Sequence, residues 1–309
     1  MTDTSKYHLP HGTSADGSYD LVVTPESAGW GYSGLRILTM RPGQAHALST
    51  GDCEFLVLPL TGSCTVTTDG TAFELAGRTG VFASATDFAY LPRASEALIS
   101  SAQGGLFALP SARTERGGHP ARYGRKEDVP VELRGAGNCS RQVNNYCLPG
   151  TFDAEQLLVC EVLTPGGNWS SYPPHKHDEV RTDDSGSAVE SELEEIYYFQ
   201  VAGEDGFAYV GAPPRERSRA WGRVYGTPER PIDVLAEVRS GDTVLIPHGW
   251  HGPSIAAPGY DLYYLNVMAG PGQDRAWLIC DDPAHGWVRG TWESQESDPH
   301  LPFGAKETE

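Results

Sequence analysis

Three short blocks in the second half of the chain carry side chains that bind metal ions. His175 and His177 stand two residues apart in Pro-Pro-His-Lys-His, a Glu-Glu pair opens the apolar run at 194–201, and two more histidines flank Gly-Trp at 248–251. Side chains two residues apart in a strand point to the same face. Three imidazoles and one carboxylate form a nitrogen and oxygen set that suits Zn, Mn, Fe or Ni. The blocks therefore predict a site for one divalent metal ion.

The carboxylate ligand has to be chosen between two neighbours. Glu195 would share a strand face with Tyr197 and Phe199, whereas Glu194 would point to the opposite face with the alternate residues. We therefore expect Glu195 to be the ligand and keep Glu194 as its rival.

The last imidazole ligand is also a choice between two residues. His251 follows a Pro-x-Gly turn and is the expected ligand, with His248 as the alternative. A histidine near the metal that is not a ligand can carry protons or contact a substrate, because its pKa lies close to neutrality. We assign that role to His248.

The elements that must present these residues are short β-strands. The chain of 309 residues contains 36 glycines and 23 prolines, and few long amphipathic helical patterns. Many short strands with Gly/Pro turns predict an all-β sandwich or barrel. The expected strands are Leu35–Met40, Glu54–Leu60, Cys64–Thr68, Val81–Ala83, Leu98–Ser101, Leu106–Leu109, Leu157–Leu163, Glu195–Val201, Gly206–Val210, Val234–Val238, Thr243–Ile246 and Tyr260–Met268.

The two halves of the chain resemble each other, which predicts a duplicated β-barrel. The run that begins at Glu54 matches the run at Glu195, and Gly80 to Pro92 echoes Gly241 to Pro247. The first copy offers only His46 for the His-x-His pair, so we expect it to be structural. The predicted domains are 1–136, without a metal set, and 137–309, with the site. The polar stretch 113–137 is expected to connect them, and the acidic stretch 178–192 to be a solvated surface loop.

Charge and composition exclude several classes of partner. The formal net charge is −18, whereas nucleic acids and anionic membranes reward clustered basic residues. No apolar run reaches 18 residues, and the N-terminus lacks the apolar core of a secretory signal. Six cysteines without a C-x-x-C pair are expected to be free thiols. We therefore expect a cytoplasmic protein that binds neither nucleic acid nor membrane; exposed strand edges could pair it into a homo-oligomer.

The ordered blocks Gly, His-x-His, Glu, then Gly-Asp, Pro-x-Gly and His resemble the two cupin motifs. Longer strings along the chain resemble the 5-deoxy-glucuronate isomerases of myo-inositol breakdown, relatives of the uronate ketol-isomerases. These strings begin at Lys6 (Lys-Tyr-His-Leu-Pro), Pro25 (Pro-Glu-Ser-Ala-Gly-Trp-Gly-Tyr-Ser-Gly), Gly137 (Gly-Asn-Cys-Ser-Arg-Gln-Val-Asn-Asn), Pro173, Leu193, Ile246, Gly259 and Trp277.

This resemblance implies a bicupin, two jelly-roll barrels in tandem. It also implies conversion of 5-deoxy-D-glucuronate to 2-deoxy-5-keto-D-gluconate by metal-assisted proton transfer through an enediolate, without a nucleotide cofactor. For this sugar acid, Arg141 with its neighbour Gln142 is the expected contact of the carboxylate. His248, Glu194 and Tyr264 are the candidate proton carriers, in that order. The alternatives are another metal-dependent bicupin enzyme, an oxygenase or decarboxylase, and a non-enzymatic sugar-binding bicupin.

Overall fold

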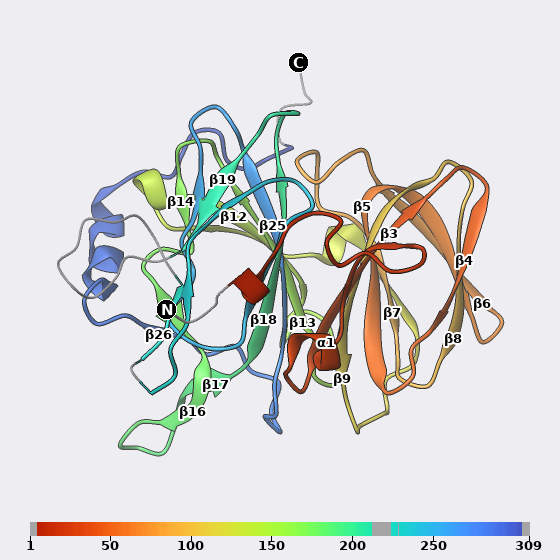
Figure 1. Ribbon diagram of the computed structural model, residues 1–309, viewed down its shortest axis with the longest axis horizontal. Helices are drawn as coiled ribbons and strands as arrows, with labels where there is room; N and C mark the ends of the chain where they lie inside the picture. The colour runs from red at the N-terminus through yellow and green to blue at the C-terminus, as the bar shows by residue number, and fades with distance from the viewer. Residues whose placement is uncertain (1–4, 212–223, 228, 305–309) are drawn as a thin grey trace.

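The computed structural model describes residues 5–211, 224–227 and 229–304. Two large antiparallel sheets pack against each other, one from each half of the chain (Figure 1). Each sheet curls over a separate core on its other side. The prediction of an all-β fold with two barrels in tandem is confirmed.

The sheet of the N-terminal half encloses the first barrel. Its described strands follow the order β10 (Arg122–Gly124), β7 (Phe88–Leu91), β5 (Cys53–Thr68), β9 (Gly105–Arg113), β3 (Ser33–Met40) and β2 (Tyr19–Val23). The long β5 also pairs with β6 (Thr71–Arg78) and β8 (Glu96–Ser101), and β8 pairs with β4 (Gln44–Ser49). The short helix α1 (Pro25–Ala28) lies between β2 and β3.

The C-terminal barrel is formed by a large sheet and a smaller one. The large sheet follows the order β1 (His8–Leu9), β23 (Thr243–Ile246), β18 (Glu194–Val201), β25 (Leu262–Ala269), β13 (Leu158–Thr164), β12 (Arg141–Cys147) and β11 (Val131–Arg134). The smaller sheet contains β14 (Trp169–Ser170), β24 (Ser254–Ala256), β19 (Ala208–Val210) and β22 (Ala236–Val238). Three strand pairs are added: β15 (His175–Lys176) with β26 (Cys280–Asp281), β16 (Asp178–Thr182) with β17 (Ala188–Glu192), and β20 (Val224–Tyr225) with β21 (Asp233–Val234).

The strand orders support the predicted duplication. The order β7-β5-β9-β3-β2 in the first sheet has the same pattern as β23-β18-β25-β13-β12 in the second. The edge strand β1, at the start of the chain, completes the sheet of the C-terminal half by pairing with β23, whereas β10 pairs with β7 within the sheet of the N-terminal half. The two halves are therefore joined by β1 as well as by the packing of their sheets.

Alternation of side chains along β18 separates the two cores. Tyr197 and Phe199 lie in the core of the C-terminal barrel, whereas Ile196 and Tyr198 lie in the core between the two large sheets. The prediction that these residues point to opposite faces is confirmed. It follows that Glu195, on the same face as Tyr197, points into the barrel.

Two expectations about local structure are wrong. Residues 178–192 form the hairpin β16–β17 in place of an irregular loop; it projects from the barrel in Figure 1. Val81–Ala83 is a turn, in which the Ala83 amide donates to the carbonyl of Gly80, and Val81 is buried there without strand pairing. The 113–137 stretch, expected to connect the two β domains, contains β10, the 3-10 turn η2 (Lys126–Asp128) and β11; β10 belongs to the sheet of the first barrel and β11 to the large sheet of the second.

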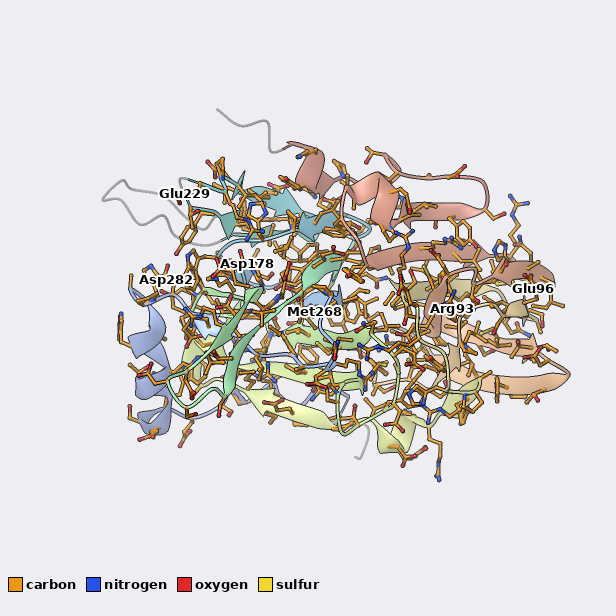
Figure 2. All side chains as sticks on the ribbon, turned by 90° about the horizontal axis from the view of Figure 1, so that it is seen from below. Arg93, Glu96, Asp178, Glu229, Met268 and Asp282 are labelled. Carbon is orange, nitrogen blue, oxygen red and sulfur yellow. The ribbon has the colours of Figure 1, made fainter. Side chains whose placement is uncertain are left out.

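The two halves of the chain form opposite ends of the molecule. Figure 2 shows Asp178 and Asp282 at the end formed by the C-terminal half, Arg93 and Glu96 at the opposite end, and Met268 between them. The 3-10 segments η3 (Gly137–Cys139) and η4 (Gly286–Ser294) also belong to the C-terminal half.

The six cysteines, all within the described part of the chain, are not joined by disulfides. Among the helices that the structure describes, none has the length and apolarity to cross a bilayer.

Candidate metal centre and substrate cavity

His175 and His251 are held side by side by their own backbones. The amide of His175 donates to the carbonyl of His251 at 2.8 Å, and the amide of His251 returns a bond of 2.8 Å to the carbonyl of His175. His175 opens β15, whose partner is β26. The rings of the two histidines lie 4.8 Å apart, centroid to centroid. This bridge selects His251 over His248 as the partner of His175.

The side chains of His175, His177, Glu195 and His251 converge inside the C-terminal barrel, and all four are buried. The three histidines form the one group of three or more candidate ligands in the part of the chain that the structure describes, with ligand atoms within 4.8 Å of one another. Oε2 of Glu195 lies 3.2 Å from Nε2 of His177 and 3.0 Å from Nε2 of His251.

These spacings fit a metal ion. Ligand atoms that each lie about 2.1 Å from one ion, at angles between about 90° and 109°, are separated by roughly 3.0 to 3.4 Å. The two Nε2 atoms of His177 and His251 lie 3.1 Å apart, and each is close to the same oxygen of Glu195. Buried imidazoles and a buried carboxylate are costly without a charged partner. The donor set therefore fits one divalent ion of the N/O type.

Glu195 is ionised in this environment. Burial by itself raises the pKa of its carboxyl, but hydrogen bonds and charge from His177 and His251 outweigh it and lower the pKa to about 2. Its other oxygen, Oε1, accepts a hydrogen bond of 2.8 Å from Nδ2 of Asn266 on β25. Asn266 was not predicted from the sequence; its only signal is that it shares the inward face of β25 with Tyr264 and Met268.

The turn before His251 is held by Asp178. Oδ2 of Asp178 accepts the backbone N–H of Gly249 at 2.9 Å, and the carbonyl of Gly249 lies 2.7 Å from Nδ1 of His251. A proton on Nδ1 leaves Nε2 of His251 free to bind a metal. Gly249 has φ +95, in the left-handed region, and an added Cβ would meet the Tyr225 carbonyl at 2.7 Å.

Lys176 fixes the base of the β16–β17 hairpin from the opposite face of its strand. Its Nζ donates to Oδ1 of Asp178 at 2.7 Å and to Oε1 of Glu190 at 2.7 Å. Glu190 is buried and also pairs with Arg181. The hairpin is therefore tied by ion pairs to the strand that carries His175 and His177.

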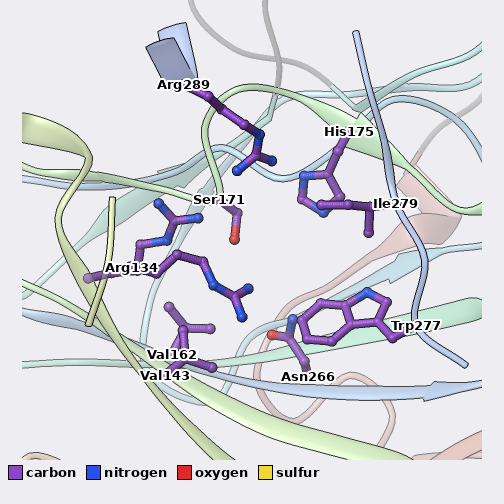
Figure 3. Close-up of a pocket in the computed structure, with 10 residues that line it drawn as sticks. Arg134, Val143, Val162, Ser171, His175, Asn266, Trp277, Ile279 and Arg289 are labelled. Atoms are coloured by element: carbon purple, nitrogen blue, oxygen red, sulfur yellow. The ribbon is translucent and has the colours of Figure 1, made fainter. Parts of the chain in front are cut away.

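A cavity opens beside the metal ligands and is lined by three arginines (Figure 3). Figure 3 shows Arg289 and Arg134 on one side and Trp277 with Asn266 on another, with Ser171 between Arg134 and His175. Val143 and Val162 form part of the wall. The tail 271–292 supplies Trp277, Ile279 and Arg289 to the cavity.

Arg141 carries the uncompensated charge of this cavity. Arg134 is paired with Glu132 at 2.7 Å, and Arg289 with Asp281 at 2.7 Å. No carboxylate among the described residues lies within ion-pair distance of Arg141, which donates to the carbonyl of Cys139 at 3.0 Å. Burial, together with the charges of Arg134 and Arg289, lowers the pKa of Arg141 to about 10, so the guanidinium remains charged at pH 7. The cavity can therefore take one anionic group.

Three predicted site residues lie elsewhere. Glu194 points away from the histidines, because adjacent strand residues face opposite sides, and it accepts backbone hydrogen bonds from the N-terminal half. Gln142 points away from the cavity for the same reason; it donates to Asn144 and accepts the N–H of Phe303. His248 does not line the cavity, and burial and the charge of Arg230 lower its pKa.

Tyr264 approaches the cavity through a serine. Its hydroxyl lies 2.8 Å from Oγ of Ser171, which lines the cavity, and donates to Oγ of Ser170 at 2.9 Å. Burial raises the pKa of Tyr264 to about 12, so its hydroxyl is protonated at neutral pH. Ser171 has φ +53, a strained conformation for a residue with a side chain, and such strain often marks functional sites.

The N-terminal barrel has a different set of residues at the matching place. Phe55 on β5 points into its core, and Nε2 of His46 lies 2.7 Å from the hydroxyl of Tyr19. Within the described ranges, no group of three candidate ligands is found in this half.

The sequence and the structure both have relatives among known proteins. The family model described as the KduI/IolB family matches residues 7–288. The chain is 40% identical over 267 residues to the 5-deoxy-glucuronate isomerase of Geobacillus thermodenitrificans (strain NG80-2), covering 86% of this chain and 89% of that protein. It is 35% identical over 271 residues to the protein of the same name from Bacillus subtilis (strain 168), covering 86% and 91%.

Solved structures of other proteins also match the fold of this chain. The crystal structure of an IolB-like protein from Salmonella typhimurium LT2 matches with a TM-score of 0.79 and 31% identity, over 91% of this chain and 98% of that one. The oxalate decarboxylase of Lactobacillus farciminis, solved as a formate complex, matches with a TM-score of 0.60 and 13% identity, over 89% and 88%. At that identity the second match shows the shared bicupin fold alone.

Proposed function

The chain belongs to the KduI/IolB family, and we propose that it converts 5-deoxy-D-glucuronate to 2-deoxy-5-keto-D-gluconate in myo-inositol breakdown. It is an isomerase, the activity that the names of the curated relatives state. The observation that carries the proposal for the site is the position of one unpaired guanidinium, Arg141, in the cavity that His175 also lines. A sugar acid presents a carboxylate at one end and a carbonyl at the other, which suits such a pair of sites.

The metal ion would be held by His175, His177, Glu195 and His251, and we propose Zn, Mn, Fe or Ni because all four suit this donor set. When bound, the ion would polarise the carbonyl and stabilise the charge that develops on its oxygen. The ligand strand β15 is tied to the His251 turn by the paired backbone bonds, so the ligands are held in place before substrate binds.

Arg141 would hold the carboxylate of the substrate. Its planar guanidinium can form two parallel hydrogen bonds to a carboxylate. Its buried charge has no acidic partner among the described residues, and a bound carboxylate would supply one. Of the predicted proton carriers, Tyr264 alone has a hydrogen-bonded connection to the cavity, through Ser171. We propose that this hydroxyl pair gives a proton to the carbonyl oxygen of the substrate and receives one from the hydroxyl oxygen that becomes the new carbonyl.

We further propose that the barrel formed mainly by residues 137–309 carries the active site, to which Arg134 at the end of β11 also contributes, and that the N-terminal barrel has a structural role. The support is the presence of Phe55 and of the Tyr19–His46 pair where the other barrel has its ligands.

The test is an assay of the purified protein on 5-deoxy-D-glucuronate, following the ketose by NMR. It is run on the protein as isolated, after chelator treatment, after return of each of the four metals, and on His177→Ala. The proposal expects turnover that is lost on chelation and in the variant, and that returns with metal. Turnover that survives both would keep the isomerase and reject the metal centre. Oxygen uptake or release of carbon dioxide without ketose would reject the isomerase.

A further inference from the structure

Asn266 connects the metal-binding carboxylate to the cavity. Its Nδ2 donates to Oε1 of Glu195 at 2.8 Å, while the other oxygen of Glu195 faces His177 and His251. A carboxylate can only accept hydrogen bonds, so the amide must present its NH₂ group to Glu195. This requirement fixes the direction of Oδ1, which points away from Glu195.

Oδ1 of Asn266 is buried and has no donor among the described residues. The side chain lines the cavity, although the residue is only 2% exposed, and Figure 3 shows it beside Trp277. A buried acceptor without a donor is unfavourable. A ligand in the cavity could therefore donate a hydrogen bond to Oδ1 of Asn266.

The other polar groups of the cavity do not supply acceptors in the same way. Guanidinium groups have five N–H donors and no acceptor. The hydroxyl of Ser171 donates to that of Tyr264, because Tyr264 donates to Ser170; the oxygen of Ser171 can still accept, but it is only half-buried and already has a partner at 2.8 Å. A polyol has hydroxyl protons that need acceptors when it leaves water. In a cavity lined by three arginines, Oδ1 of Asn266 is the acceptor that is both buried and uncommitted.

We propose that Oδ1 of Asn266 accepts a hydrogen bond from a hydroxyl of the sugar acid and so selects substrates that carry a hydroxyl near the metal centre. The inference rests on the proposed function, because it assumes that the cavity holds a polyhydroxy acid. Asn266 thereby has two tasks: its NH₂ positions Glu195, and its carbonyl oxygen recognises the substrate. A site built to pair a hydroxyl rejects the analogue that lacks it, since its own polar group is then left unpaired.

The test compares substrates on the same protein. The kcat/KM of metal-loaded enzyme is measured for 5-deoxy-D-glucuronate and for the analogues in which the hydroxyl at C3 or at C4 is replaced by hydrogen, since the C2 hydroxyl becomes the carbonyl of the product and has to stay. The wild type should prefer the parent substrate over one of these analogues by about ten-fold or more. In Asn266→Leu, which has nearly the same size, this preference should fall close to one. A ratio between two substrates cancels differences in folding and metal loading, so Asn266→Ala can replace a Leu variant that folds poorly.

Asn145 provides a matched control. It is a buried asparagine of the same barrel whose Oδ1 also lacks a donor among the described residues, but it does not line the cavity. Asn145→Leu should keep the wild-type preference.

A second readout avoids turnover altogether. Calorimetry gives the Kd of the polyol acid made by reducing the substrate carbonyl, and of its deoxy forms, with metal content measured in parallel. Removing the same hydroxyl should raise the Kd for the wild type and should leave the Kd for Asn266→Leu unchanged. An unchanged preference in Asn266→Leu, in either measurement, would overturn the inference while leaving the isomerase in place. A wild type that does not convert 5-deoxy-D-glucuronate would instead reject the proposed function.

Discussion

Glu54 and Glu194 make the same contact in opposite directions across the two halves of the molecule. The carboxylate of Glu54, on β5, accepts the backbone N–H groups of residues 155, 156 and 157 at 2.6 to 2.9 Å. The carboxylate of Glu194, on β18, accepts those of residues 31, 32 and 33 at 2.6 to 2.9 Å. Each carboxylate thus holds the segment that enters the matching strand, β13 or β3, of the other half.

This relationship corrects the alignment of the two repeats. The sequence pattern made Glu54 the equivalent of Glu195 in the other repeat. The contacts instead make Glu54 the equivalent of Glu194, so the residue equivalent to Glu195 is Phe55. The shift by one residue exchanges the faces of the strand. It also accounts for two adjacent glutamates: Glu194 joins the two halves, and Glu195 points to the three clustered histidines.

We expect Glu194→Gln and Glu54→Gln each to destabilise the protein by about 1–3 kcal/mol, because an amide presents an N–H to some of the three backbone donors and leaves them unpaired. Urea denaturation measures the change. Metal content of Glu194→Gln should stay at the wild-type value, since its side chain faces away from the histidines. Glu192→Gln, at an exposed position two residues earlier, is the control and should have little effect. Loss of metal from Glu194→Gln would contradict the assignment of Glu194 to the contact between the two halves and of Glu195 to the metal.

Glu195→Gln should instead lose metal. It keeps the shape of the side chain but removes the charge that offsets a divalent ion among three imidazoles. Metal analysis after dialysis should give less than one ion per chain for this variant and about one for the wild type. The wild type should also melt at a lower temperature after chelation, since binding to the folded state stabilises it. Equal melting temperatures with and without chelator would speak against a metal held by these four residues.

Asp178→Ala should weaken metal binding although Asp178 is not expected to be a ligand. Its Oδ2 accepts the N–H of Gly249, whose carbonyl sets the ring of His251. Partners that orient a ligand typically contribute about 10- to 100-fold to metal affinity. Competition with a chromogenic chelator measures the Kd. Asp183→Ala, at the exposed tip of the same hairpin, should leave it unchanged. An equal effect of both substitutions would assign the loss to the hairpin as a whole.

Arg141→Met should raise KM for the sugar acid and lower kcat/KM by about 10²-fold or more, because losing one partner of a buried charge pair costs roughly 2–5 kcal/mol. Arg141→Lys should recover only part of this, since an ammonium group lacks the two-pronged geometry. Binding of an uncharged polyol of the same length should not weaken. If the neutral ligand weakens as much as the acid, Arg141 supports the cavity and does not hold the carboxylate.

Asp242 should make the attachment of β1 depend on pH. Burial raises the pKa of this carboxyl, but hydrogen bonds from His8 and from the amides of His11 and Arg239 outweigh it and lower the pKa below its ordinary value of 3.8. A lowered pKa in the folded state means that the carboxylate stabilises the fold above pH 3.8 and loses this effect as the pH falls through the folded value.

Asp242→Asn should therefore be about 1–2 kcal/mol less stable than the wild type at pH 7. The difference should begin to shrink below pH 3.8, where the carboxyl of the unfolded chain takes up a proton, and should be lost as the pH falls through the lower pKa of the folded carboxyl. Urea midpoints of both proteins between pH 3 and pH 7 measure this on the intact chain. A difference that stays constant over the whole range would show that the carboxylate charge plays no part.

The sequence by itself determined the features that depend on local alternation. The period of two along β18 separated Glu195 from Glu194, and the Gly/Pro-punctuated runs predicted an all-β chain with two related halves. The sequence also predicts His175, His177 and His251 as candidate ligands, because metals bind few types of side chain, and the structure brings these three residues together. Long strings shared with known isomerases identified the family, which no single motif could do.

The tertiary structure decided everything that depends on which strands become neighbours. Strand alternation could not show that His251 is bridged to His175, or that Arg141 stands without an acidic partner. Asn266 meets Glu195 because β25 pairs with β18, and Arg289 and Trp277 reach the cavity from a tail more than a hundred residues after Arg141. Register and sheet order are set by packing of the whole chain, so these contacts have no local sequence signal.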